Sequence, residues 1–263
     1  MNKVRPKKSL GQHFLKDLSI AEQIADTLKP FSELPILEVG PGMGVLTDFL
    51  LEKYKQLKVI EIDRDSIPYL HNKYPEMGSN ILEGDFLQID ISALFPSPFC
   101  VIGNYPYNIS SQIFFKVLEY KHLIPCCSGM IQREVGIRLA AKPGNKDYGI
   151  LSVLIQAWYD VEYLFTVSEH VFDPPPKVKS AVVRLTRNQT EHLGCDERFF
   201  KTVVKTAFNQ RRKTMRNSLR QLCENNTDLL SAPIFDKRPE QISVNDFIEL
   251  TNAIQRAMKQ RDE

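Results

Sequence analysis

The sequence contains no apolar run of the roughly 20 residues that a helix needs to cross a bilayer. Residues 1–15 are basic and polar and lack the apolar region of a secretory signal peptide. We therefore expect a soluble cytoplasmic protein without a membrane partner. Cysteine is also scarce. The five cysteines are odd in number and none has the spacing of a zinc site, which predicts reduced thiols and no metal centre.

A large net charge is also absent, because 34 Lys and Arg stand against 32 Asp and Glu, a formal net charge of +2. The distribution of charge says more, since it predicts two positive regions of the kind that bind polyanions. The first is the N-terminus, with Lys3, Arg5, Lys7 and Lys8. The second spans residues 199–223, which hold no acid and the basic residues Lys201, Lys205, Arg211, Arg212, Lys213, Arg216 and Arg220. A loose tail and a solvated helix face remain the alternative interpretations.

Hydrophobic residues make up 43% of the 263, enough for a full core in one large domain plus a small one. Short apolar runs predict strands at 35–39, 58–62, 80–83, 99–102, 128–132, 161–167 and 180–186. Helical periodicity predicts helices at 20–28, 45–54, 66–74 and 110–120. Because strands and helices alternate, we expect a mostly parallel sheet covered on both faces.

The pattern changes after residue 187. Residues 188–195 are polar and typical of a linker, and no strand-like alternation follows them. Val204, Phe208, Met215, Leu219 and Leu222 fall on one helical side, and most of the basic residues fall on another. We expect an α/β domain over residues 1–187 and a small all-α domain over 188–263, with a last helix at 244–258.

Three motifs lie at or just after the ends of the first three predicted strands. Residues 40–44 have the spacing G-x-G-x-G, which differs from the G-x-G-x-x-G of dinucleotide-binding folds and favours a nucleoside cofactor without pyrophosphate, such as S-adenosylmethionine (SAM). Glu61 follows about twenty residues later, where an acid accepts from ribose hydroxyls. Asp85, next to Phe86, is placed to accept from an adenine amine. Each motif alone is also typical of a turn or a helix N-cap, but together they point to one rim of one sheet.

The run Asn104-Tyr105-Pro106-Tyr107 follows the fourth strand. The Asn104 side-chain oxygen and the Tyr105 carbonyl can both accept N–H bonds from one amine, and Tyr107 can stack on the ring that carries it. Pro106 biases Tyr105 towards an extended backbone, so this carbonyl is available to a ligand. An ordinary strand-to-helix turn is the alternative. Nothing in the sequence explains why the side chain at 105 is aromatic.

These segments resemble the KsgA/RsmA family of SAM-dependent ribosomal RNA adenine N6-dimethyltransferases. The resemblance covers essentially the whole chain, through residues 11–15, 40–44, 61–63, 84–85, 104–107, 132–135, 172–180 and 208–217. Segments 172–180 (FDPPPKVKS) and 208–217 (FNQRRKTMRN) are the most specific to this family. Two positions depart from the family pattern: His13 stands where Asn is common, and Tyr105 where Leu, Ile or Pro is common.

The resemblance implies a Rossmann-like SAM-dependent methyltransferase fold, with a mostly parallel seven-stranded sheet and a small C-terminal all-α domain. It implies that residues 1–187 bind SAM and catalyse, and that 188–263 recognise RNA. The implied catalytic residues are Asn104, Tyr105, Pro106, Tyr107 and Phe172. The implied cofactor contacts are His13, Leu15, Gly40, Gly42, Glu61, Asp85 and Asn104. The implied RNA contacts are Arg211, Arg212, Lys213, Arg216 and Arg220.

In this interpretation the target base lies between Tyr107 and Phe172. The alternative for Phe172 is a core phenylalanine under a rigid loop. The alternative for His13 is a surface residue on a mobile tail. The implied substrate is a pair of adjacent adenines in a hairpin near the 3′ end of small-subunit rRNA, each methylated twice, within an immature ribosomal subunit. We expect a monomeric enzyme. The alternatives are a large-subunit rRNA dimethyltransferase of the macrolide-resistance type, a non-catalytic nucleic-acid-binding factor on the same fold, and a nicotinamide oxidoreductase, which the glycine spacing disfavours.

Overall fold

The computed structural model describes residue 7 and residues 10–262; Lys3, Arg5 and Lys8 of the predicted basic N-terminus lie outside the described residues. The chain forms two compact units. The first extends to Gly136 and resumes over Asp160–Arg187, and the second contains Ile137–Tyr159 and the chain from Asn188 onward. The second junction falls at the boundary predicted from the sequence. Residues 137–159, which the sequence analysis placed in the first domain, lie in the second unit.

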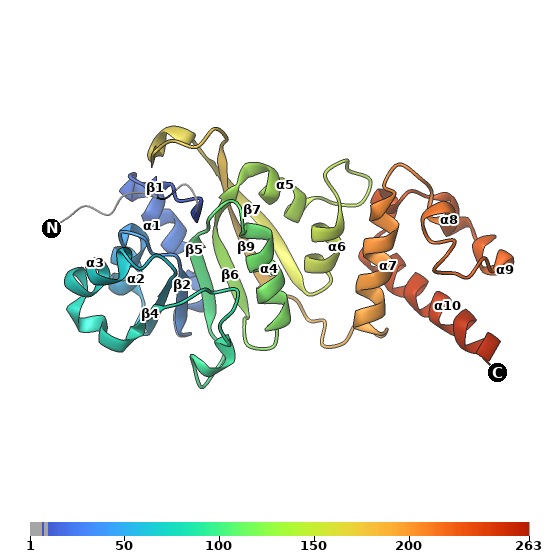
Figure 1. Cartoon of the computed structure of the whole chain (residues 1–263), viewed down its shortest axis with the longest axis horizontal. Helices are drawn as coiled ribbons and strands as arrows, with labels where there is room; N and C mark the ends of the chain where they lie inside the picture. The colour runs from blue at the N-terminus through green and yellow to red at the C-terminus, as the bar shows by residue number, and fades with distance from the viewer. Residues whose placement is uncertain (1–6, 8–9, 263) are drawn as a thin grey trace. The chain divides into compact units, whose positions relative to one another are not determined.

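Seven strands form the sheet of the first unit, in the order β4-β3-β2-β5-β6-β9-β7 (Figure 1). Their bounds are β2 Ile36–Val39, β3 Leu57–Glu61, β4 Ile81–Glu83, β5 Cys100–Asn104, β6 Cys126–Gln132, β7 Tyr159–Val167 and β9 Ser180–Arg187. Strands β4, β3, β2, β5 and β6 are parallel, and β9 is antiparallel to β6. The predicted mostly parallel, seven-stranded sheet is therefore confirmed.

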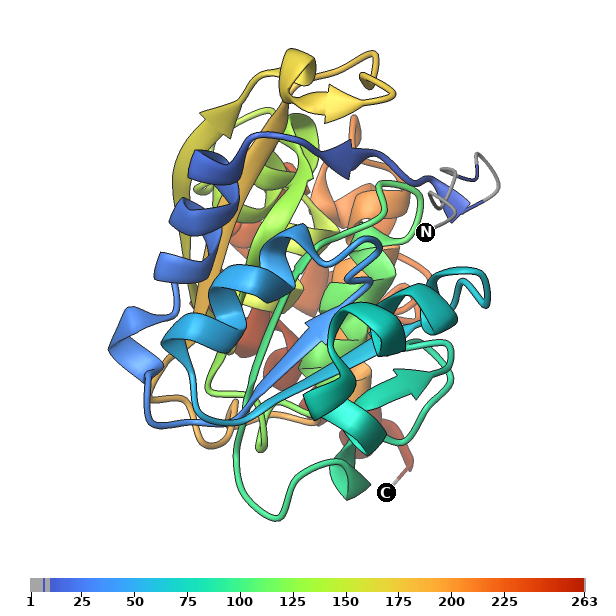
Figure 2. The same ribbon diagram turned by 90° about the vertical axis from the view of Figure 1, so that its left-hand side faces the viewer.

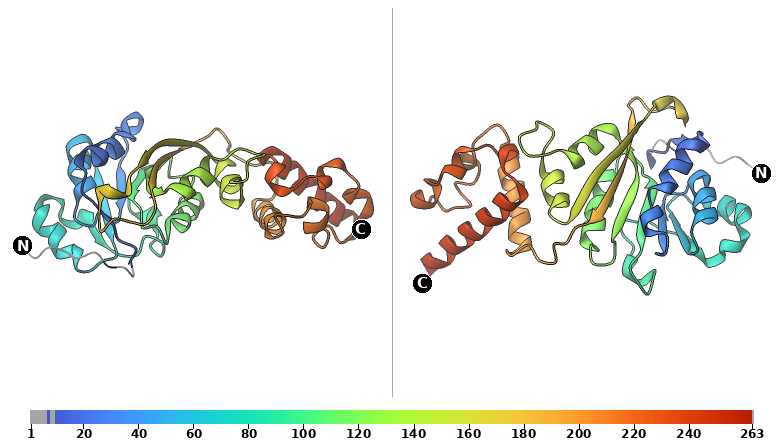
Figure 3. Two further views of the ribbon diagram at one scale, coloured as in Figure 1. Left: turned by 90° about the horizontal axis from the view of Figure 1, so that it is seen from above. Right: turned by 180° about the vertical axis from the view of Figure 1, so that it is seen from behind.

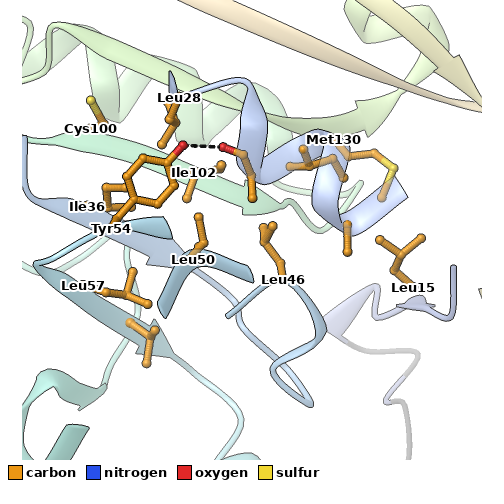
Figure 4. Packing of buried hydrophobic residues seen from close by; sticks show 14 of the residues in the cluster. Leu15, Leu28, Ile36, Leu46, Leu50, Tyr54, Leu57, Cys100, Ile102 and Met130 are labelled. Atoms are coloured by element: carbon orange, nitrogen blue, oxygen red, sulfur yellow. Dashed lines mark hydrogen bonds between the residues drawn. The ribbon is translucent and has the colours of Figure 1, made fainter. Parts of the chain in front are cut away.

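Helices α1 (Leu18–Asp26), α2 (Val45–Lys53) and α3 (Ser66–Lys73) contribute to one hydrophobic cluster against the sheet. Helix α1 begins after Asp17, whose carboxylate accepts the backbone N–H groups of Ser19 and Ile20. Figure 4 shows this cluster, in which the Tyr54 hydroxyl donates to the Ala25 carbonyl at 2.7 Å. Helix α4 (Ser110–Glu119) buries Ile113, Phe114 and Val117 on the other face of the sheet (Figures 1 and 2).

A small second sheet joins two segments that are far apart in the sequence. Strand β1 (Phe14–Leu15) pairs antiparallel with β8 (Phe172–Asp173), so that Leu15 faces Phe172 in register. Each strand has two residues, too few for an alternating pattern, and the sequence analysis did not predict them. Figure 2 shows β1 crossing above the carboxyl ends of the parallel strands. The pairing therefore holds the N-terminal segment over that edge of the sheet.

The second unit is helical among the described residues. Helix α5 (Arg133–Ala140) leads into it, and its other helices are α6 (Ile150–Gln156), α7 (Glu197–Asn209), α8 (Met215–Ser218), α9 (Thr227–Leu230) and α10 (Val244–Asp262). Helix α7 packs against α10 (Figure 3), with the rings of Phe208 and Phe247 centred 6.0 Å apart. Helix α6 also contacts α7, which explains why residues 137–159 belong to this unit.

The single apolar helical side predicted over residues 204–222 does not form. Helix α7 ends at Asn209 and α8 begins at Met215, so the basic segment 211–213 lies in a turn between them. The backbone N–H of Met215 donates to the Lys237 carbonyl instead of continuing a helix. Met215 and Leu219 are still fully buried, whereas Leu222 is partly exposed.

The five cysteines are free thiols, as the sequence predicts. Across residue 7 and residues 10–262, no helix combines the length and the apolar character needed to span a membrane. The described residues also contain no group of three or more His, Cys, Asp or Glu arranged to hold a metal ion.

Candidate active site

A cavity opens at the carboxyl ends of β2, β3, β4 and β5 in the first unit. Five segments and two single residues line it: residues 10–15, 38–46 except Gly44, 60–62, 84–86 and 104–107, together with Ile24 and Ile109. The structure thus brings together ten of the residues that the sequence analysis proposed for cofactor binding or catalysis. They are His13, Leu15, Gly40, Gly42, Glu61, Asp85, Asn104, Tyr105, Pro106 and Tyr107. Phe172 does not line this cavity.

The glycine loop turns sharply between β2 and α2. Gly40, Gly42 and Gly44 have φ values of 70°, 57° and 75°, in the left-handed region that favours glycine. A Cβ on Gly44 would lie 2.3 Å from the Tyr74 hydroxyl oxygen, so this position has no room for a side chain. A Cβ on Gly40 would meet nothing within 4 Å. The backbone at Gly40 therefore leaves open space for a ligand.

Glu61 ends β3 and is almost fully buried, with 3% of the residue exposed. One carboxylate oxygen accepts the Gly42 N–H at 3.0 Å, and the other accepts the Asp63 N–H at 2.8 Å. Burial raises the pKa of Glu61, although these two backbone hydrogen bonds oppose the shift. The side chain is thus held between the glycine loop and the end of β3, and its role as a ribose acceptor stays a prediction.

Glu38 also lines the cavity, although the sequence analysis did not list it as a site residue. It is 1% exposed, and its carboxyl group accepts from the Thr47 hydroxyl at 2.7 Å. Burial raises the pKa of Glu38 to about 8, and the neighbouring charge of Glu61 adds to the shift. Its position two residues before the glycine loop is the sequence feature that could have identified it as a site residue.

Asp85 lies beside the cavity at the end of β4. One of its carboxylate oxygens accepts the Leu87 N–H at 2.9 Å. Asp85 therefore also stabilises the turn after β4, which is the alternative role that the sequence left open. The hydrogen bonds of the described residues leave its second oxygen without a donor. Phe86 next to it is 4% exposed and lines the same cavity.

The N-terminal segment is fastened over the cavity by polar contacts. The His13 carbonyl accepts from Asn104 Nδ2 at 3.1 Å, and His13 Nδ1 lies 2.8 Å from the Pro174 carbonyl, which it reaches as the donor. A second fastening involves Asp63, which accepts from Lys7 Nζ at 2.5 Å and from Gln12 Nε2 at 3.2 Å. The sequence analysis proposed His13 but missed Gln12 and Asp63.

Asp63 is a buried carboxylate with charged and polar donors around it. Burial alone would raise the pKa of Asp63, but hydrogen bonds from Lys7, the Asp65 N–H and Gln12 outweigh burial and lower it. Asp63 therefore stays ionised and holds the N-terminal segment next to Glu61.

The side-chain amide of Asn104 has a fixed orientation. Because Nδ2 donates to the His13 carbonyl, Oδ1 is left as an acceptor. Within residue 7 and residues 10–262, no hydrogen bond reaches Asn104 Oδ1 or the Tyr105 carbonyl. Two acceptors from adjacent residues are thus available at the cavity.

Tyr107 and Phe172 have different surroundings. Tyr107 lines the cavity, its hydroxyl lies 2.5 Å from Ser180 Oγ, and its ring centre is 5.4 Å from that of His13. Phe172 is 1% exposed and belongs to the hydrophobic cluster with Leu15 and Ile24. The structure therefore places Phe172 in the core, which is the alternative position, and its stacking on a base stays a prediction.

The residues predicted to bind RNA lie in the second unit and differ in their surroundings. An Arg211 Nη atom donates to the carbonyls of Lys146 and Tyr148. Arg216 donates to the Leu230 carbonyl at 3.1 Å and pairs with Asp236 at 2.8 Å. Two of the five predicted residues thus hold the unit together.

Arg212, Lys213 and Arg220 are exposed, and their side chains form no hydrogen bond or ion pair with the residues that the structure describes. Of the five residues predicted to bind RNA, these three therefore have charged side chains that are available to a polyanion.

Comparisons with known proteins agree with this geometry. Residues 3–256 match the family described as ribosomal RNA adenine dimethylase. A protein of Parabacteroides distasonis named ribosomal RNA small subunit methyltransferase A is 64% identical over 99% of this chain and 98% of its own length. A protein of the same name from Phocaeicola vulgatus is 62% identical over 99% of this chain and 94% of its own length.

Two solved structures share the fold. A dimethyladenosine transferase from Plasmodium falciparum has a TM-score of 0.80 at 26% identity and covers 94% of this chain and 98% of its own. The 23S rRNA methyltransferase ErmE has a TM-score of 0.65 at 28% identity and covers 92% and 99%. The expected Rossmann-like methyltransferase fold is confirmed by these matches together with the sheet order.

The raised pKa of Glu38 predicts how stability depends on pH. Between about pH 4.5 and pH 8 the Glu38 carboxyl group binds more protons in the folded protein than in the unfolded chain, so its contribution to the free energy of unfolding falls as the pH rises through this window. In Glu38→Gln this contribution is absent. From pH 5 to pH 8, we expect the free energy of unfolding of the variant to rise relative to that of the wild type by on the order of 4 kcal/mol. Urea unfolding at both pH values measures this, and equal pH dependence in the two proteins would contradict the assignment.

Proposed function

Because the chain belongs to the ribosomal RNA adenine dimethylase family, we propose that it transfers methyl groups from SAM to the N6 amine of adenines in small-subunit rRNA. The observation that carries this proposal is the pair of open acceptors, Asn104 Oδ1 and the Tyr105 carbonyl, at the cavity that the glycine loop, Glu61 and Asp85 also line. The names of the relatives supply the class of RNA.

The residues around the cavity fit SAM. Gly40 leaves open space beside the backbone, Glu61 offers carboxylate oxygens to ribose hydroxyls, and Asp85 has an oxygen free for an adenine amine. A cationic ligand bound beside the buried carboxyl groups of Glu38 and Glu61 would favour their charged forms. SAM supplies a methyl group bonded to a positively charged sulfur.

The chain's own contribution is to position and polarise the target amine. Adenine N6 is a poor nucleophile because its lone pair is delocalised into the ring. Two acceptors that take its N–H bonds favour a more tetrahedral nitrogen and hold it in one place. Asn104 is already oriented for this by the His13 carbonyl, so little reorganisation is needed when the base enters. Tyr107 lies at the same cavity and offers an aromatic face for the base.

The finer description of the substrate follows from the family resemblance and from RNA chemistry. The target is a pair of adjacent adenines in a hairpin near the 3′ end of the small-subunit rRNA, each methylated twice, in an immature subunit. Loops suit this enzyme because their bases are already unstacked and reach a cavity at lower cost. In this proposal the enzyme acts as a monomer in the cytoplasm.

Methylation of large-subunit rRNA is a second candidate function, and one structural comparison favours it. The likeness to ErmE, a 23S rRNA methyltransferase, makes large-subunit rRNA the second candidate substrate. The higher TM-score of the dimethyladenosine transferase and the 62–64% identity to the small-subunit relatives favour the first candidate. Assays on isolated small and large subunits separate the two. A non-catalytic role is disfavoured because Glu61, Asp85 and Asn104 are all present at the cavity.

Replacing Asn104 by Ala tests the amine clamp. We expect methylation to fall by about a hundredfold to a thousandfold, since one of two acceptors for the reacting amine is removed, with a smaller change in SAM affinity. Turnover of an rRNA substrate and calorimetry with SAM measure the two effects. Asn108→Ala is the matched control, because Asn108 is exposed four residues further along the same segment. Unchanged turnover in Asn104→Ala would contradict the assignment.

The exposed cations of the second unit predict the salt dependence of RNA binding. We expect Arg212→Gln combined with Lys213→Gln to lower the slope of log affinity against log salt by about two, because each side chain neutralises one phosphate. A control with the same charge change is Lys29→Gln with Lys55→Gln, two exposed lysines of the first unit. Fluorescence titration at several salt concentrations gives both slopes. If the slope is the same in both double variants, residues 212–213 do not contact phosphate.

A further inference from the structure

The side chain of Tyr105 has a position that the proposed chemistry does not require. Only the backbone carbonyl of residue 105 serves the amine, and any residue supplies a carbonyl. Yet the Tyr105 side chain is one of the largest fully buried groups of the protein, with 1% of the residue exposed. Burying a tyrosine hydroxyl is unfavourable unless it finds a partner, so the surroundings of this ring need an explanation.

The ring fills a hollow that two glycines leave in the sheet. Gly103 of β5 and Gly129 of β6 are register partners on neighbouring parallel strands. A Cβ on Gly103 would lie 2.6 Å from the Val39 carbonyl oxygen, and one on Gly129 would lie 2.2 Å from the Gly103 carbonyl oxygen. Backbone atoms therefore exclude a side chain at both positions, and the space in front of them must be filled from elsewhere.

Tyr105 covers both positions at once. The two Cε atoms of its ring lie 2.9 Å and 2.6 Å from the points where a Cβ would stand on Gly103 and Gly129. The ring also contacts Phe114 edge to face, with centroids 6.0 Å apart. A leucine, which has no ring and no hydroxyl, would leave part of this hollow empty.

The side chain and the backbone of Tyr105 both form hydrogen bonds with β6. Its hydroxyl donates to the Ser128 carbonyl at 2.7 Å, and its backbone N–H donates to the Met130 carbonyl at 3.0 Å. Ser128 is itself fixed, because its hydroxyl accepts from Thr27 at 2.7 Å and donates to the Val183 carbonyl at 2.9 Å. Tyr105 is therefore attached to β6 at two points, through its side chain and through its backbone N–H, and these two bonds hold the residue whose carbonyl faces the cavity.

We propose that the Tyr105 side chain is a positioning group for the target amine. By filling the glycine hollow and bonding to Ser128, it fixes the direction of the Tyr105 carbonyl, one of the two acceptors. This inference rests on the proposed function. It also predicts an unequal effect on the two methylations. An unmethylated amine has two N–H bonds and is still held by Asn104 if the carbonyl shifts, whereas a monomethylated amine has one N–H left and depends more on a rigid pair of acceptors.

The test compares Tyr105→Phe, which keeps the ring and removes the hydroxyl, with Tyr105→Leu, which removes both. We expect Tyr105→Phe to lower kcat by about threefold to tenfold, the effect of one lost hydrogen bond, with a SAM affinity within about twofold of the wild type. Tyr105→Leu should lower kcat by more than about tenfold. In both variants N6-monomethyladenosine should accumulate relative to the dimethylated product, as measured by mass spectrometry of digested RNA.

Tyr54→Phe is the matched control, because Tyr54 is also a buried tyrosine of the first unit whose hydroxyl donates to a backbone carbonyl, and it does not line the cavity. If Tyr105→Phe lowers the melting temperature as Tyr54→Phe does but leaves kcat and the product ratio of the folded enzyme unchanged, the side chain is purely structural and the inference is wrong. The wild-type reaction tests the proposed function separately: a wild type that forms no N6-methylated adenosine overturns that function and the inference with it.

Discussion

Strand β2 pairs in parallel with β3 on one side and with β5 on the other, and the position of every group in the cavity depends on this pairing. The chain leaves β2 towards β3 and β4 and then returns to the opposite side as β5, so the sheet order reverses next to β2. Open α/β sheets bind ligands at such a reversal, outside the carboxyl ends of the strands. The glycine loop, Glu61, Asp85 and Asn104 lie at the end of β2, β3, β4 and β5 or just after it, and they meet there for that reason.

Buried carboxyl groups give this edge of the sheet its electrostatic character. Glu38 and Glu61 are both almost fully buried, and burial raises the pKa of each. Backbone N–H groups of the glycine loop and of Asp63 stabilise Glu61, and the Thr47 hydroxyl stabilises Glu38. A cationic ligand such as SAM would relieve the cost of keeping these groups charged, so ligand binding and the ionisation of the site are coupled.

The sequence predicted the parts of this structure that depend on local patterns. Seven apolar runs gave seven strands, because strand periodicity and flanking glycines are local signals. The pairing of β1 with β8 was not predictable in this way, since it joins two-residue segments more than 150 positions apart. Arg211 and Arg212 are neighbours of like charge, and only the fold shows that the first is bonded to the carbonyls of residues 146 and 148. The aromatic side chain of Tyr105 was unexplained for the same reason, because the glycine it covers on β6 is 24 positions away.

The central claim is that this chain methylates adenine N6 in small-subunit rRNA. The most direct measurement is mass spectrometry of nucleosides from small ribosomal subunits isolated from a strain that lacks the protein, before and after incubation with the purified protein and SAM. The account predicts that N6,N6-dimethyladenosine is absent before the incubation and appears at two adjacent adenines near the 3′ end afterwards. Methylation that appears only in large-subunit rRNA, or no N6-methylated adenosine in either subunit, would contradict it.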